Sequence, residues 1–374
     1  WVIATPIILL ILVTTLLYIP FVQDKVVDFA SSKLSSSTGM TIDIGKLRLG
    51  FPLKLNLSDV TVVQAGGDTM LTASSAGVRV ALMPLLKGNV EAEGISLRDA
   101  FYQLGNADSA LWLRAHVARG DISTVGIGLK TSLIDLDRAD IAGVKVKMRM
   151  LPDTTVTPVD TTASTPWLIR ANAINLRDLT YTMEMLPLID SLGCSLETAA
   201  LRDATIDMGR YLIHGRSLSI DSVSAAYIYP AVSDTVAPTA TAAESTPSAT
   251  PWTITADSLR LTAREGLYAQ RGAIPAPGFD PAYIAVNSVE IAIDSFYNRG
   301  ADIRVPVRRI AATERCGLPL RADGLFSMDS TAMNLTDFSV ATDRSTLTVN
   351  AMMGMGDLTA PTPVPLSLKG SGVI

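Results

Sequence analysis

Histidine, cysteine and closely spaced charges are scarce in this sequence, and each scarcity argues against a class of function. Only two histidines occur, His116 and His214, and neither has a second histidine or cysteine at the spacing of a metal site. The two cysteines, Cys194 and Cys316, are too far apart for a zinc site or a CxxC redox pair. We expect two free thiols, with a disulfide in an oxidising compartment as the alternative.

Charge is equally sparse. Charged residues make up 18% of the chain, and the formal net charge is −5. No basic tract is longer than the pair Arg308-Arg309, so the sequence predicts no nucleic-acid partner. The chain has no GxSxG or HExxH motif, and residues 126–131 lack the Gly-Lys pair of a phosphate loop. We therefore predict that the protein is not an enzyme and has no catalytic residue, cofactor or metal ion.

What is present is a large aliphatic fraction. Hydrophobic residues make up 48% of the 374 residues but aromatic residues only 6%, so the apolar content is mainly Leu, Ile, Val, Ala and Met. Together with abundant Thr and Ser, this composition favours β-strands. The length exceeds that of one ordinary core, which predicts several units or an extended repeat.

The first segment differs from the rest because residues 2–21 contain no charge. About 20 residues at ~1.5 Å each give ~30 Å, the thickness of one bilayer core. A cleaved signal peptide is the alternative, but its apolar region spans only about 7–15 residues. We predict a transmembrane helix over 1–21, followed by a helical extension over 22–38. The predicted membrane-spanning residues are Ile7, Leu9, Leu12, Leu16 and Ile19.

From residue 39 onward the apolar period changes to two, which predicts strands with one apolar and one polar face. The segments 152–166 and 230–251 consist largely of Thr, Pro, Ser and Ala, and we expect them to be disordered insertions. The apolar positions of the clearest strands are candidates for a lipid groove. They are Ile42, Ile44, Leu55, Leu57, Val78, Val80, Val144, Val146 and Met148.

A short sequence pattern recurs in this part of the chain. Thr165-Pro166-Trp167 returns as Thr250-Pro251-Trp252, and the apolar residues that follow return at the same offset. The triplet Leu97-Arg98-Asp99 recurs at 176–178 and 201–203. Recurrence at long period indicates structural units that stack on one another.

The order of the N-terminal pieces resembles the AsmA-like/TamB family of Gram-negative envelope proteins, in its Bacteroidota form. An anchor is followed by a "TG-x-x-I-x-I" segment, an "L-x-L-x-D-V-x-V" segment, a "PLLKG-x-V" segment and an "I-x-L" segment. The matching stretches are residues 18–23, 38–44, 47–53, 55–62, 82–90 and 94–97. The resemblance is close over residues 1 to about 104, and the remainder is similar to the later β repeats of the family.

The resemblance implies an inner-membrane protein with a cytoplasmic N-terminus and a body in the periplasm. It also implies a curled sheet with an apolar interior, phospholipid as the ligand, and an Omp85-type outer-membrane barrel as a partner through a C-terminal region. The chain begins at Trp1, not Met, so we expect a fragment of a longer protein. The predicted fold class is mostly β: one transmembrane helix, then an elongated antiparallel repeat sheet over 39–374 that forms an open trough.

Three functions remain open on this sequence. The first is a conduit for phospholipid between inner and outer membranes, because an apolar trough can shield an acyl chain without chemistry. At about 25 cal/mol/Å², several hundred Å² of shielded chain is worth on the order of 10 kcal/mol. The second is a chaperone or assembly factor for outer-membrane barrels, and the third is a membrane-anchored structural β-solenoid.

Overall fold

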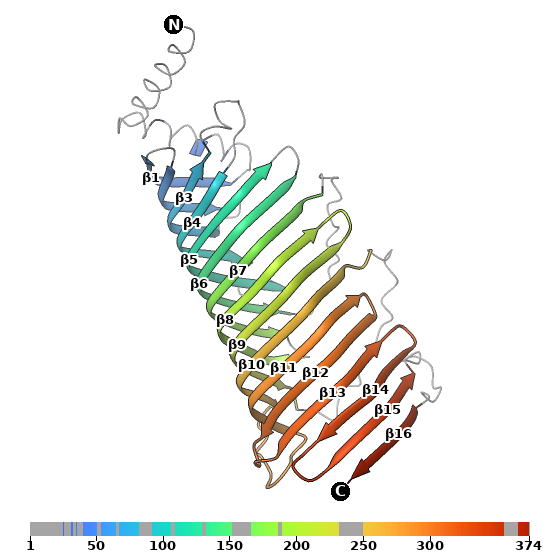
Figure 1. Cartoon of the computed structure of the whole chain (residues 1–374). Coiled ribbons are helices and arrows are strands. Elements are labelled where there is room, and N and C mark those ends of the chain that lie inside the picture. Colours follow the sequence, from blue (N-terminus) through green and yellow to red (C-terminus); the bar gives the residue numbers. More distant parts are fainter. Residues whose placement is uncertain are drawn as a thin grey trace. The chain divides into compact units, whose positions relative to one another are not determined.

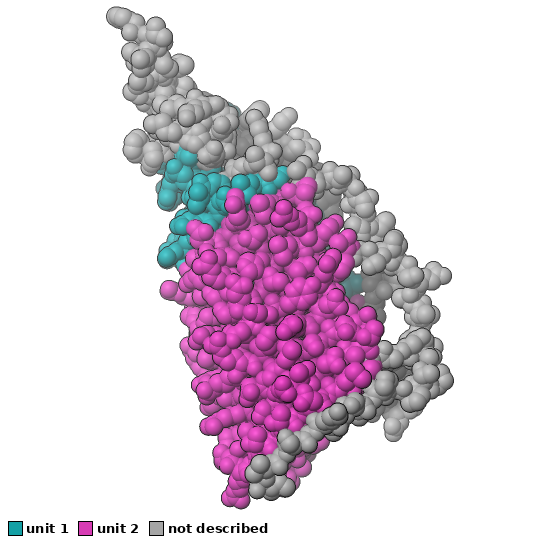
Figure 2. Space-filling view, turned by 45° about the vertical axis from the view of Figure 1, so that its right-hand side comes forward, with its two compact units in different colours: residues 1–149 teal, residues 150–374 magenta. Residues whose placement is uncertain are grey.

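The computed structural model describes residues 40–50, 54–64, 67–81, 92–105, 109–128, 132–151, 166–185, 189–231, 250–354 and 366–373, with Lys25, Ser31, Ser32 and Ser35 as isolated positions. The chain divides into two compact units, residues 1–149 and 150–374 (Figure 2). Both are mostly β, which confirms the β-rich character predicted from composition. Within each unit, strands that follow one another in the chain are neighbours in the sheet (Figure 1).

The first unit contains six strands. They are β1 (Thr41–Gly50), β2 (Lys54–Val63), β3 (Thr69–Val80), β4 (Ala92–Leu104), β5 (Leu111–Gly128) and β6 (Leu133–Met150). The pairs from β1 to β5 are antiparallel. Between β5 and β6, the Ser123 hydroxyl contacts the Arg138 carbonyl at 3.4 Å, and Ala118 lies against Gly143. Between these two contacts the residue numbers increase along β6 as they decrease along β5, so this hairpin is antiparallel too.

A row of backbone irregularities crosses the sheet of the first unit. Asp59, Asp99 and Gly143, on alternate strands, have φ angles of 54°, 45° and 67°. The strands beside them place small residues in the same row: Gly45 adjoins Asp59 and Ala118 adjoins Gly143. Positive φ is accessible to Gly and to a lesser extent Asp. In the ladders of β1 to β5, each strand leaves one residue unpaired at this row, and the register continues unchanged on either side. We call this line the bulge row.

The bulge row changes the spacing of side chains. Leu97 and Ala100 both lie in apolar rows although their positions differ by three, because Asp99 is an additional, unpaired position between them. Ile44 and Leu47 are likewise both buried, at 8% and 7% exposure. The bulge thus keeps the apolar side chains of a strand on one face as the strand passes through it.

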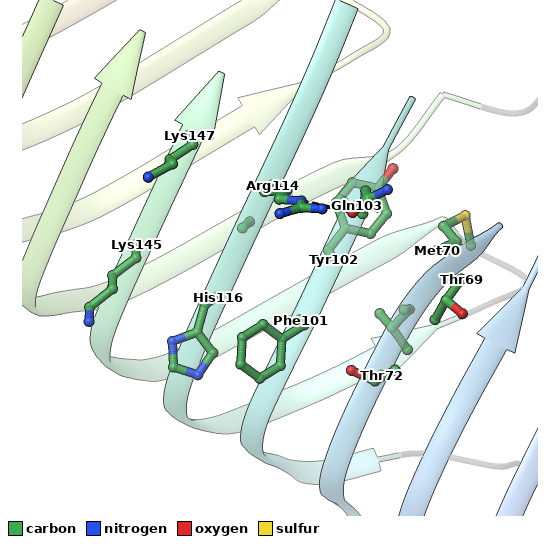
Figure 3. A pocket seen from close by; sticks show the side chains of 12 residues that line it. Thr69, Met70, Thr72, Phe101, Tyr102, Gln103, Arg114, His116, Lys145 and Lys147 are labelled. Atoms are coloured by element: carbon green, nitrogen blue, oxygen red, sulfur yellow. Dashed lines mark hydrogen bonds between the residues drawn. The ribbon is translucent and has the colours of Figure 1, made fainter. Parts of the chain in front are cut away.

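The strands also bend at the bulge row. Figure 3 shows the strands carrying Thr72, Phe101, His116 and Lys145 turning just beyond these residues and running back behind them. Phe101 and His116 lie on the near side of the ribbon, and Tyr102 lies behind it. Ala73 and Ala100, on the apolar face beside the row, are only 4% and 7% exposed. The apolar face therefore lies on the inside of the bend, where these side chains are buried.

The second unit contains ten strands. They are β7 (Leu168–Met185), β8 (Ile189–Asp207), β9 (Leu212–Tyr229), β10 (Thr253–Gln270), β11 (Tyr283–Arg299), β12 (Asp302–Glu314), β13 (Pro319–Met328), β14 (Ala332–Ala341), β15 (Thr346–Gly354) and β16 (Leu366–Val373). Positive φ recurs on six of these strands, at Asp178, Asp203, Ser222, Ser288, Ser295, Gly324 and Asp337.

The recurrent Leu-Arg-Asp triplet coincides with these positions of positive φ. Asp178 and Asp203 are the last residues of its second and third copies. The Asp203 carboxylate forms an ion pair at 3.1 Å with Arg216, which lies directly across from it on β9. In β14, the Asp337 amide donates to the Asn350 side chain at 2.8 Å, which satisfies the backbone group freed by the bulge. The repeat noted in the sequence therefore encodes bulge positions.

Two elements of the predicted fold class are wrong. The sheet is not antiparallel throughout, because β9 and β10 pair in parallel. Parallel neighbours require a crossover of a dozen or more residues, and residues 230–252 provide a connection of that length. This segment includes the second insertion predicted from composition, and its residues 232–249 lie outside the described ones, as do residues 152–165 of the first.

The second correction concerns the predicted transmembrane helix. No helix in the part of the chain that the structure describes is both long and apolar enough to cross a bilayer. The fold shown by the structure is accordingly a β-sheet fold without such a helix in its described residues. Residues 1–21, with the predicted membrane-spanning positions Ile7, Leu9, Leu12, Leu16 and Ile19, lie outside that part.

Candidate functional site

The most extensive candidate surface is the apolar face of the first unit, which the pairing register defines. On one side of the bulge row, its rows contain Leu47, Leu57, Ala76 and Leu97, then Leu49, Leu55, Val78, Ile95 and Ile122. On the other side they contain Ile44, Val60, Ala73, Ala100 and Val117, then Ile42, Val62, Leu71, Tyr102 and Ala115. None of these rows contains a charged residue.

The predicted groove residues all fall on this face. Ile42, Ile44, Leu55, Leu57 and Val78 lie in the rows given above, and Val80 follows Val78 by alternation beyond a register shift at Arg79. Val144, Val146 and Met148 join the face from β6 because Gly143 adjoins Ala118. Ile44 and Val144 are each 8% exposed, and the other seven are half-buried. The structure thus brings these nine residues together on one face.

The opposite face of the same sheet carries the charges. Arg98 and Arg119 lie directly across from each other on β4 and β5. Their mutual repulsion is offset by Asp121, which forms an ion pair with Arg98 at 3.6 Å and a second with Arg119. Exposed ion pairs of this kind contribute little stability, roughly 0–1 kcal/mol. Their effect is to keep the polar face solvated and so to fix which face is apolar.

None of the described strands of the first unit forms a second layer over the apolar face. Among the described strands of this unit, the substantial contacts are between sheet neighbours. Ordinary domains bury an apolar sheet face against a second layer. The half-buried side chains of this face therefore remain available to an apolar ligand.

The second unit has a similar face, on which a tyrosine and a cysteine are partly shielded from water. Tyr181 of β7 pairs with Cys194 of β8, and Leu179 pairs with Leu196 in the next row. Burial raises the pKa of the Tyr181 phenol and also raises the pKa of the Cys194 thiol. Tyr227 and Tyr268 stack with ring centroids 5.5 Å apart. Cys194 and Cys316 are both free thiols.

The two histidines have local partners. His116 stacks on Phe101 at 4.2 Å between ring centroids, and His214 shares a hydrogen bond of 2.9 Å with Thr255. Within the described ranges, no group of three or more His, Cys, Asp or Glu side chains is placed to hold a metal ion. The surface with a clear chemical character is thus the apolar face.

Sequence reasoning missed the bulge row. The available signal was the spacing Leu-x-Asp followed by an apolar residue, as in Leu57 to Val60 and Leu201 to Ala204. An apolar spacing of three inside a period of two indicates an inserted residue, and Asp tolerates the left-handed backbone that the insertion requires.

Comparison with known proteins adds no relative: no family model, no curated protein and no solved structure matches this chain.

Proposed function

We propose that the apolar face of the first unit binds the acyl chains of phospholipid and conducts lipid along the sheet between the inner and outer membranes of a bacterial envelope. The observation that carries the proposal is the uncharged face that neighbouring strands share, over which no other described strand of that unit packs. The resemblance to AsmA-like/TamB proteins supports the same activity and a periplasmic location.

The energetics favour reversible binding. Each CH₂ group removed from water contributes about 0.8 kcal/mol. An acyl chain of about sixteen carbons that is shielded on one side is therefore held with several kcal/mol of binding free energy. The alternating rows of Leu, Ile, Val and Ala offer no hydrogen bond or charge that would fix a ligand at one position. A lipid held in this way can slide from row to row while its headgroup remains in water.

The test places one charge on either face of one strand. Leu55→Asp introduces a carboxylate on the apolar face, whereas Asn56→Asp introduces it next door on the polar face, across from Arg48. A carboxylate in the acyl path raises the free energy of the bound acyl chain by at least about 1.4 kcal/mol. Lipid transfer between vesicles should therefore fall about tenfold or more. Asn56→Asp should leave transfer within about twofold.

A second variant guards against loss of folding. If Leu55→Asp reduces the far-UV circular dichroism, Met148→Asp in β6 probes the same face in another strand. Equal transfer by the folded apolar-face variant and by Asn56→Asp would contradict the proposal. Enrichment of a barrel protein without any bound lipid in the purified chain would instead favour the chaperone function.

A further inference from the structure

A hollow of about 440 Å³ lies in the first unit, and most of the residues that line it belong to the polar face, although Leu71, Tyr102 and Ala115 of the apolar rows also border it. Figure 3 shows His116, Lys145 and Lys147 on the near side of the strands, in front of the ribbon, and Tyr102 behind it. Four of the residues that line it are basic or can become so: Arg114, His116, Lys145 and Lys147. None of its lining residues is acidic. We call it the basic hollow.

The hairpin register concentrates these charges. With Ala118 against Gly143, Arg114 lies across from Lys147 and His116 lies across from Lys145. Residues directly across a ladder are about 5 Å apart, and alternate residues of one strand are about 7 Å apart. Like charges directly across from each other destabilise a sheet. These four side chains therefore destabilise the β5–β6 hairpin unless an anion binds between them.

The cations differ in how firmly they are held. The Arg114 Nε donates to the Gln103 side chain at 2.8 Å, and its guanidinium lies 5.0 Å from the Trp112 ring centroid. Lys145 and Lys147 are exposed and form no ion pair within the described part of the chain. The Asp99 carboxylate is 3.8 Å from His116 Nε2, and its side chain is 63% exposed. One positioned guanidinium and two unpaired ammonium groups thus face a common volume.

Aromatic side chains form one wall of the basic hollow. Phe101 is 53% exposed and stacks on His116. An exposed aromatic surface beside convergent cations suits an anion with an organic part attached. A phosphate matches three cations better than a carboxylate does, because it carries more charge and offers three terminal acceptor oxygens.

We propose that the basic hollow binds a phosphate group, either that of a soluble phosphate compound or that of a lipid headgroup at a membrane surface. This site is separate from the acyl path, since Lys145 and Val146 are adjacent in β6 and project to opposite faces. The binding of phosphate therefore does not depend on the conduit function, and either proposal can fail without the other.

The experiment titrates the full chain with inorganic pyrophosphate in a calorimeter, at low and at physiological ionic strength. The double variant Lys145→Gln/Lys147→Gln removes two of the three permanent charges and should weaken binding about tenfold or more. The matched control is Lys46→Gln/Lys54→Gln, which removes two lysines elsewhere in the same unit. This control should change the affinity less than about twofold. Wild-type affinity should fall as salt is raised.

A flotation assay with phosphatidylcholine vesicles containing phosphatidylglycerol distinguishes the two sources. Loss of vesicle binding in the Lys145/Lys147 variant alone supports a headgroup as the source, and loss of pyrophosphate binding alone supports a soluble phosphate. The double variant should also melt no lower than wild type, because a like-charge repulsion has been removed. The proposal is overturned if neither probe binds, or if the control variant loses as much affinity as the double variant.

Discussion

Replacing Gly143 with alanine tests the bulge row at its tightest contact in the first unit. Gly143 has φ +67°, and a Cβ built there lies 2.7 Å from the Cβ of Ala118. The left-handed conformation costs an alanine about 1–2 kcal/mol. Two carbons prefer about 3.5–4.0 Å, and overpacking of this kind costs a further ~1–3 kcal/mol. We therefore expect Gly143→Ala to destabilise the β5–β6 hairpin by about 2–5 kcal/mol.

The double variant Gly143→Ala/Ala118→Gly separates the two contributions. Removing the Ala118 methyl relieves the clash but leaves the strained φ, and the new glycine alone costs about 0.5–1 kcal/mol. The double variant should therefore be at least as stable as Gly143→Ala, although it carries two changes that are each unfavourable. Hydrogen exchange of β5 and β6 peptides measures this locally, which matters in a chain of two units.

A control defines the baseline for this hairpin. Gly126 is also in β5, has no positive φ, and a Cβ there meets nothing within 4 Å. Gly126→Ala should change protection by no more than about 0.5 kcal/mol. Simple additivity of Gly143→Ala and Ala118→Gly would refute the contact on which the row is built.

Three further outcomes follow from the structure. Asp99→Val should destabilise β4 by about 1–2 kcal/mol more than Asp99→Asn, because asparagine tolerates φ +45° and valine does not; equal protection of β4 peptides would contradict this. Burial raises the pKa of Tyr181, so its tyrosinate absorbance should appear above the pH of a free tyrosine, and Tyr181→Phe should remove that late component. The thiol and then the amide of Cys316 donate to Glu314 and lower the pKa of its carboxyl, so this stabilisation is present above pH 4.5 and is lost as pH falls through the lower folded pKa. Glu314→Gln should flatten that part of the acid-unfolding curve of the second unit, and an unchanged curve would contradict it.

The strands and their apolar faces were predictable because local alternation encodes them. The pairs Leu49 with Leu55 and Ile42 with Val62 are hairpin neighbours, and short connections make such pairs the default. Strict alternation nevertheless assigns Ile44 and Leu47 to opposite faces. In β1, Gly45 is left unpaired beside the left-handed Asp59 of β2, and Ile44 and Leu47 on either side of it are both buried.

Other features depend on long-range register, which a single sequence does not encode. Nothing local in β9 or β10 specifies that Ser217 lies beside Ser258 in a parallel pair, since that follows from the length of the connection. The basic hollow arises in the same way, because Arg114 and Lys147 become neighbours only once Ala118 and Gly143 are aligned.

Photocrosslinking from the two faces of one strand tests the conduit most directly. Val62 lies in the apolar row between Ile42 and Leu71, and its neighbour Thr61 lies on the polar face between Asp43 and Thr72. A benzophenone amino acid placed at Val62 should crosslink to phospholipid acyl chains when the protein is irradiated with native membranes, and the same group at Thr61 should not. Equal crosslinking from the two positions, or crosslinking from Thr61 alone, would contradict an acyl path along the apolar face.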